Sequence, residues 1–114
     1  MNAETLKGHL DLLLLAAVQS HPSHGYAIAE TLRARSSGAF DLPEGTLYPA
    51  LHRLEKRKLL KSSWGLSRNN RRAKYYEITT KGRAALVREA STWSSFTKAV
   101  TTVMTSADRP AWAK

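Results

Sequence analysis

The feature that most constrains this chain is the uneven distribution of its charge. Half of the 18 Lys and Arg residues, but only one of the nine acidic residues, fall in segment 52–74. That segment therefore carries nearly all of the formal net charge of +9. A solvated face with no partner usually mixes both signs. The one-sided charge favours contact with nucleic acid, an anionic lipid surface or another polyanion.

The basic segment begins on a helix with two different faces. Leu47, Leu51 and Leu54 recur at the spacing of one buried helix face, which predicts a helix over 46–58. Pro49 fits this helix because it falls in the first turn, where a missing N–H has no partner to lose. The opposite face and its flank carry Pro49 together with aromatic, imidazole and basic groups: Tyr48, His52, Arg53 and Lys56. Such a helix suits a nucleic-acid groove.

A β-hairpin with a basic tip is predicted next. Segment 59–67 reads as a strand, 68–72 as a turn and 74–79 as the return strand. Asn at the turn tolerates left-handed backbone angles. Because Tyr75 and Tyr76 point to opposite faces, one of them is expected in the core.

Two helices are predicted upstream, over 6–19 and 25–35. Ser23 is a suitable N-cap for the second of them. The segment 40–42 is expected to form a small edge strand.

The last predicted helix spans 81–104 and is capped by Thr80. It has an apolar stripe with no obvious partner within the chain, because the preceding elements already form a complete small fold. A second copy of the chain is the economical partner, and folding back onto the chain's own core is the alternative. We therefore expect residues 1–80 to form the nucleic-acid-binding domain, residues 81–106 the dimerisation helix and residues 107–114 a mobile tail. The expected dimerisation residues follow a heptad-like spacing: Leu86, Ala90, Trp93, Phe96, Val100 and Met104.

Several classes of protein are disfavoured. The chain has no Cys, which rules out disulfides and thiolate zinc sites and suits a cytoplasmic protein. The longest apolar run, 12–18, is far shorter than the roughly 20 residues of a membrane helix. His21 and His24 have a spacing seen in metal sites, but no catalytic or phosphate-binding motif accompanies them. We expect no metal, no cofactor, no membrane contact and no enzymatic activity.

Four stretches in one continuous order carry a family resemblance. They are LDLLLLAAV at 10–18, HGYAIAETL at 24–32, GTLYPALHRLEKRKLL at 45–60 and RRAKYYEITTKGRAAL at 71–86. Together they resemble the PadR family of transcriptional regulators, in its short-tailed subgroup. The tip of the hairpin departs from a common family pattern, because arginines and asparagines stand where Gly and Pro often occur.

The resemblance implies a mainly α fold with a small β-hairpin, namely a winged helix-turn-helix followed by a C-terminal dimerisation helix. It implies a homodimer that represses genes from a pseudo-palindromic operator, and in some members release by small aromatic or drug-like molecules. It makes 46–58 the recognition helix, with Tyr48 at its DNA-facing start. From the residues we expect base or groove contact by Pro49, His52 and Arg53. The expected phosphate contacts are Lys56, Arg71, Arg72 and Lys74.

Plainer interpretations stay open for several residues. Instead of contacting DNA, Tyr48 could pack beside helix 25–35. Lys56 could likewise belong to a solvated helix end. Trp64 is expected to pack on the hairpin rather than to contact a ligand. Trp93 and Phe96 are expected in the dimer core, with an effector pocket between subunits as the minority alternative. The rival function is a non-specific nucleic-acid-binding or architectural winged-helix protein.

Overall fold

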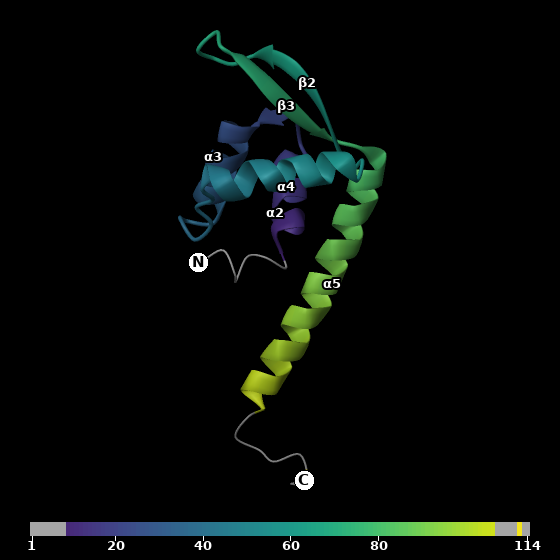
Figure 1. Cartoon of the computed structure of the whole chain (residues 1–114). Helices are drawn as coiled ribbons and strands as arrows, with labels where there is room; N and C mark the ends of the chain where they lie inside the picture. Colours follow the sequence, from purple (N-terminus) through teal and green to yellow (C-terminus); the bar gives the residue numbers. More distant parts are fainter. Residues whose placement is uncertain (1–8, 107–111, 113–114) are drawn as a thin grey trace.

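A computed structural model describes residues 9–106 and residue 112. In this part of the chain it has four helices and a three-stranded sheet, which confirms the predicted mainly α fold with a hairpin (Figure 1). Residues 6–8 of the first predicted helix and most of the predicted tail 107–114 lie outside the described residues. The elements in order are α2 (Leu10–Val18), β1 (Ser23–His24), α3 (Gly25–Arg35), α4 (Glu44–Lys56), β2 (Leu60–Leu66), β3 (Arg72–Ile78) and α5 (Thr80–Thr105).

The core lies where α2, α3 and α4 meet beneath the sheet. Helix α2 contacts α3, α4, α5 and β3, so its apolar centre is covered on several sides. Leu14 and Leu15 of α2 have no exposed surface, and neither have Ile28 of α3 or Leu51 and Leu54 of α4. Burying one such side chain contributes about 1.5–3 kcal/mol. This cluster fixes the angle at which α4 crosses the other helices.

The sheet has the antiparallel order β1-β3-β2. The predicted edge strand at 40–42 is wrong, because those residues form no strand and Phe40 packs against the core instead. The third strand is β1, where Ser23 pairs with Tyr76 and His24 pairs with Tyr75. Sequence patterns do not reveal a strand of two residues.

Three local details of the helices also differ from expectation. The N-cap of α3 is His24, whose Nδ1 accepts from the Ala27 amide at 3.2 Å, while Ser23 is buried in β1. The N-cap of α5 is Thr79 rather than its neighbour Thr80. Helix α4 begins two residues earlier than predicted, with Pro43 as its N-cap. It also ends two residues earlier, because Lys58 adopts a φ of 64°.

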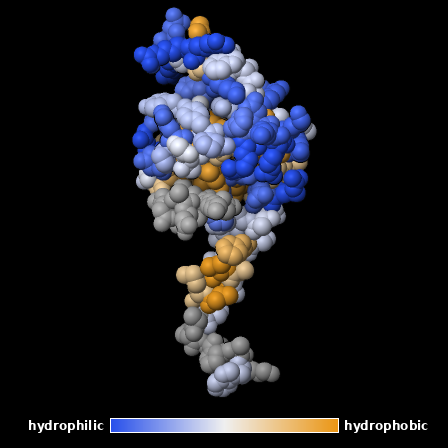
Figure 2. All heavy atoms as spheres, viewed as in Figure 1, coloured by the Kyte–Doolittle hydropathy of each residue, from blue (hydrophilic) through white to orange (hydrophobic). Residues whose placement is uncertain are grey.

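Helix α5 leaves the body as a long arm (Figure 1). Gly82 and Ala85 are buried in its first two turns, Leu86 packs partly on the core, and every residue from 87 to 106 is exposed. Figure 2 shows hydrophobic groups gathered on this arm below a largely hydrophilic body. Within the described residues, no helix has the length and hydropathy needed to cross a membrane.

Candidate nucleic-acid interface

Helix α4 presents the two faces that the sequence predicts. Leu47, Ala50, Leu51 and Leu54 are buried. Pro49, His52, Arg53 and Lys56 are exposed on the other side. Pro49 lies in the second turn of the observed helix, so the first-turn placement expected from the sequence is wrong. The exposed side of α4 can therefore contact a ligand.

Tyr48 packs beside the start of α3 and is also exposed to solvent over 42% of its surface. A Cβ at Gly25 would lie 2.5 Å from Tyr48 Cε1 and 2.7 Å from its hydroxyl oxygen. Only a glycine therefore allows the ring its position against α3. The sequence left these two interpretations of Tyr48 as alternatives, and the geometry is compatible with both.

The hairpin of β2 and β3 is the wing. Its seven residue pairs run from Leu60 opposite Ile78 to Leu66 opposite Arg72. The loop is closed by the Ser67 amide, which donates to the Arg71 carbonyl at 2.8 Å, and Asn70 has the left-handed φ of 59° that the turn needs. Three exposed cations lie in or beside this loop, and a fourth, half-buried, lies further along β3: Arg68, Arg71, Arg72 and, on β3, Lys74.

Glu55 ties the base of the wing to α4. Its carboxylate accepts from the Ser62 hydroxyl on β2 and lies 3.2 Å from Lys74 Nζ on β3. The Ser62 hydrogen bond, followed by the bond and charge of Lys74, lowers the pKa of Glu55 against the opposing effect of burial. Lys74 is thus partly held by an acid of its own chain. The contact sets how the wing stands over the exposed face of α4.

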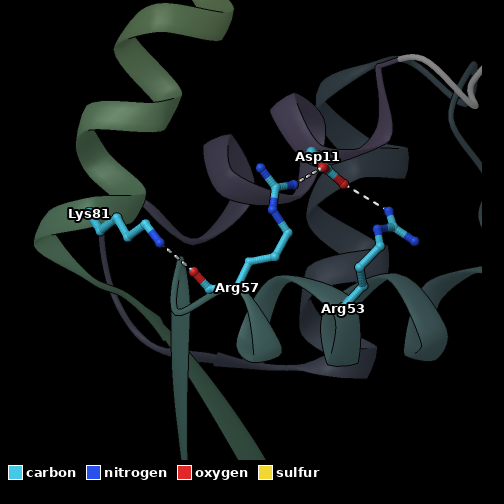
Figure 3. A network of polar contacts seen from close by, with 4 residues as sticks. All are labelled: Asp11, Arg53, Arg57 and Lys81. Carbon is cyan, nitrogen blue, oxygen red and sulfur yellow. Dashed lines mark hydrogen bonds and ion pairs between the residues drawn. The ribbon is translucent and has the colours of Figure 1, made fainter.

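Asp11 at the start of α2 holds Arg53 of α4 and Arg57, the C-cap residue of that helix (Figure 3). Its carboxylate accepts from Arg53 Nη2 and Arg57 Nη1, each at 2.8 Å. Lys81 of α5 donates to the Arg57 carbonyl at 3.0 Å. The network therefore joins α2, α4 and α5, and it gives Arg53 a partner within the chain.

An open groove of about 1040 Å³ separates the start of α3 from the wing. Aromatic rings gather along it, and its wing side carries cations. Sequence reasoning missed this groove, because the short strand β1 that brings α3 to the edge of β3 left no pattern. The rings that line it are Tyr26, Tyr48, Trp64, Tyr75 and Tyr76.

The histidines do not form a metal site in the described part of the chain, where no group of three or more His, Cys, Asp or Glu residues could hold an ion. His24 Nδ1 caps α3, and His21 Nδ1 contacts the Ser23 hydroxyl at 3.2 Å.

Three helices with an exposed third helix and a basic hairpin beside it define a winged helix-turn-helix protein. A family model for PadR-like transcriptional regulators matches residues 14–88, and the chain belongs to this family. The family consists of transcriptional regulators and not of enzymes.

The chain is similar to solved transcriptional regulators and to one uncharacterised protein. A transcriptional regulator from Clostridium thermocellum superposes with a TM-score of 0.78 at 28% identity, over 88% of this chain and 97% of that one. A PadR family transcription regulator from Clostridium difficile gives 0.74 at 31% identity, over 85% and 99%. An uncharacterised protein of Lysinibacillus sphaericus is 30% identical over 94 residues, which cover 82% of this chain and 86% of that protein.

Proposed function

We propose that this protein is a sequence-specific regulator that binds double-stranded DNA as a homodimer and represses transcription from a pseudo-palindromic operator in the cytoplasm. The observation that carries the proposal is a helix, α4, that is apolar inside and exposed outside, next to a basic wing. An α-helix fits the major groove of B-DNA, and its outward side chains reach base edges.

The residues fall into two roles. Tyr48, Pro49, His52 and Arg53 contact bases or the groove wall from α4. Lys56 binds a phosphate near the end of that helix, and the wing cations Arg71, Arg72 and Lys74 bind phosphates beside the groove. Arg53 and Lys74 reach DNA by leaving or sharing their carboxylate partners, Asp11 and Glu55.

The dimer forms through the arm of α5, which is the dimerisation helix proposed for residues 81–106. Trp93, Phe96, Val100 and Met104 are exposed along one side of it, and Ala90 extends the stripe. A row of exposed large apolar side chains on one side of a helix is typical of an interaction surface. Leu86 packs on its own core and forms the edge of the interface. A small hydrophobic or aromatic effector would bind beside Trp93, between the subunits.

Replacing both Arg71 and Arg72 with Ala is expected to weaken binding to every duplex. Each phosphate that the protein no longer neutralises removes about 0.9 from the slope of log K against log salt, so the slope should flatten by about 2. Fluorescence anisotropy across a salt series measures it. A matched control replaces Arg88 and Lys98, two exposed cations on α5, and should leave the slope as it was. An unchanged slope in the wing variant would contradict the role of the wing.

Replacing Asp11 with Asn is expected to strengthen binding to all duplexes about 3- to 10-fold at low salt. The change releases Arg53 and Arg57 and removes a negative charge beside α4, so the salt slope should steepen by about 1. Stability should change by less than about 1 kcal/mol, because both arginines are more than half exposed.

The matched control is Glu77→Gln, which makes the same change in net charge but frees only Lys61, its 3.8 Å partner on the wing. Equal effects of the two variants on affinity and slope would show that Asp11 acts only through net charge, which would contradict its specific role.

The second candidate function is a non-specific or architectural DNA-binding protein. The density of cations on the wing favours it, because phosphate contacts carry no sequence information. Enrichment of one motif from random duplexes separates the regulator from this alternative.

A further inference from the structure

One face of the wing exposes apolar side chains among its cations. Trp64 is 60% exposed and Leu66 is 65% exposed. In the register of the hairpin Trp64 lies opposite Lys74, and Leu66 lies opposite Arg72. Directly opposite residues point to the same face of a sheet, so apolar and cationic groups alternate on this one face.

That face looks toward α4 and not away from it. Ser62 and Tyr76 share it, since alternate residues of a strand point the same way. Ser62 donates to Glu55 of α4, and Tyr76 is buried. Trp64 and Leu66 lie further along the same face, toward the tip of the wing. There they are exposed and can contact a ligand that binds the exposed side of α4.

Trp64 is held in place by a cation. The Arg72 guanidinium carbon lies 4.4 Å from the centre of the Trp64 ring, within the range of a cation–π contact. The contact orders the indole and the guanidinium together while both stay exposed. A large ring ordered at the surface loses little conformational entropy when a ligand packs on it.

Trp64 and Arg72 border the groove between the wing and α3. Trp64, Arg72 and Lys74 line it on the wing side, and Tyr26 and Tyr48 line it on the helix side. Its one acidic lining residue, Glu30, is paired with Arg33. The groove therefore offers rings for packing and unopposed guanidinium groups for an anion.

We propose that this groove takes one sugar–phosphate strand of the duplex, with the Trp64 indole packed on deoxyribose and Arg72 and Lys74 on the adjoining phosphates. A nucleic-acid strand alternates apolar sugar with charged phosphate, and the wing face alternates in the same way. A second copy of this strongly basic hairpin would bring like charges together, so charge complementarity favours DNA. The inference rests on the proposed function.

If Trp64 packs on deoxyribose, part of the binding free energy should not depend on salt concentration. Replacing Trp64 with Ala should weaken duplex binding about tenfold at every salt concentration, in line with aromatic contacts to nucleic acid. The salt slope should stay that of the native protein, because every cation that pairs with a phosphate is still present. Trp64→Phe keeps a ring and should restore most of the affinity. Trp112→Ala, at another exposed Trp, should bind as the native protein does.

A second measurement uses the native sequence and does not depend on how the variants fold. The protein is labelled with 5-fluorotryptophan, and the Trp64→Phe spectrum assigns the Trp64 resonance. Addition of duplex should shift or broaden that resonance.

Three results would overturn the inference: a bound complex with an unmoved Trp64 resonance, Trp64→Ala that binds as tightly as the native protein, or a Trp64→Ala sedimentation profile showing that self-association is abolished. If the native protein binds no duplex at all, the proposed function fails instead, which is a different result.

Discussion

Replacing both Trp93 and Phe96 with Asp is expected to give a folded monomer that binds its operator about a hundredfold or more weakly. Both rings are exposed, and the arm contributes only Gly82, Ala85 and part of Leu86 to the core. Trp93 also contacts the ring of the exposed His9 at 4.7 Å, which is a surface contact, so the body should keep its stability. A monomer reaches one half-site only and cannot engage the second. Analytical ultracentrifugation and anisotropy titration measure the two effects.

A control variant carries the same two charges on the other side of the arm. Val87 and Thr102 are exposed and lie well away from the apolar stripe at 100° per residue. Val87→Asp with Thr102→Asp should remain dimeric and bind as tightly as the native protein. If the Trp93 and Phe96 variant stays dimeric, the arm is not the dimer interface.

Replacing Gly82 with Ala is expected to destabilise the fold by about 3 kcal/mol, near the upper end for overpacking a core. The added Cβ would lie 2.1 Å from the Leu59 carbonyl oxygen and 2.8 Å from Ile78 Cγ1. The first of these neighbours is backbone, and that backbone is fixed because the Leu59 carbonyl also accepts from the Thr79 amide at 3.1 Å. Urea unfolding followed by circular dichroism measures the loss.

Gly45→Ala is the matched control, because it adds the same methyl group to the first turn of another helix. A Cβ at Gly45 meets no atom within 4 Å. The substitution should therefore stabilise the protein, by about 0.4–1 kcal/mol through the unfolded chain. Equal effects of the two substitutions would mean that Gly82 is not packed tightly against Leu59 and Ile78.

The strongly periodic elements were predictable from the sequence. The observed bounds of α3, 25–35, are those predicted, since Pro22 and the Ser-Ser-Gly that follows the helix mark its two ends. Strand alternation predicted that one of Tyr75 and Tyr76 lies in the core, and the structure buries Tyr76 while Tyr75 stays partly exposed. These features depend on local geometry, which the sequence carries directly.

Features that depend on tertiary contacts were not predictable. The cap of α3 fell on His24 because pairing with Tyr76 draws Ser23 into the sheet. Phe40 resembles a strand residue, but the core takes its ring, and β1 occupies the free edge of β3. In both places a neighbour distant in the sequence decided the outcome.

The candidate site shows the same division. The exposure of His52 and Lys56 followed from the helix period. The partner of Arg53 did not, because Asp11 lies 42 residues away and only the crossing of α2 and α4 brings the two together. The open position of Trp64 likewise depends on how far the hairpin extends beyond the core.

Selection from random duplexes tests whether the protein binds DNA sequence-specifically as a dimer. The native protein is incubated with a random duplex library near physiological salt, and the retained DNA is sequenced. A sequence-specific dimer should enrich a two-fold-related motif with half-sites about one helical turn apart. Retention of DNA with no enriched motif, or no retention by a folded protein, would contradict sequence-specific binding by a dimer.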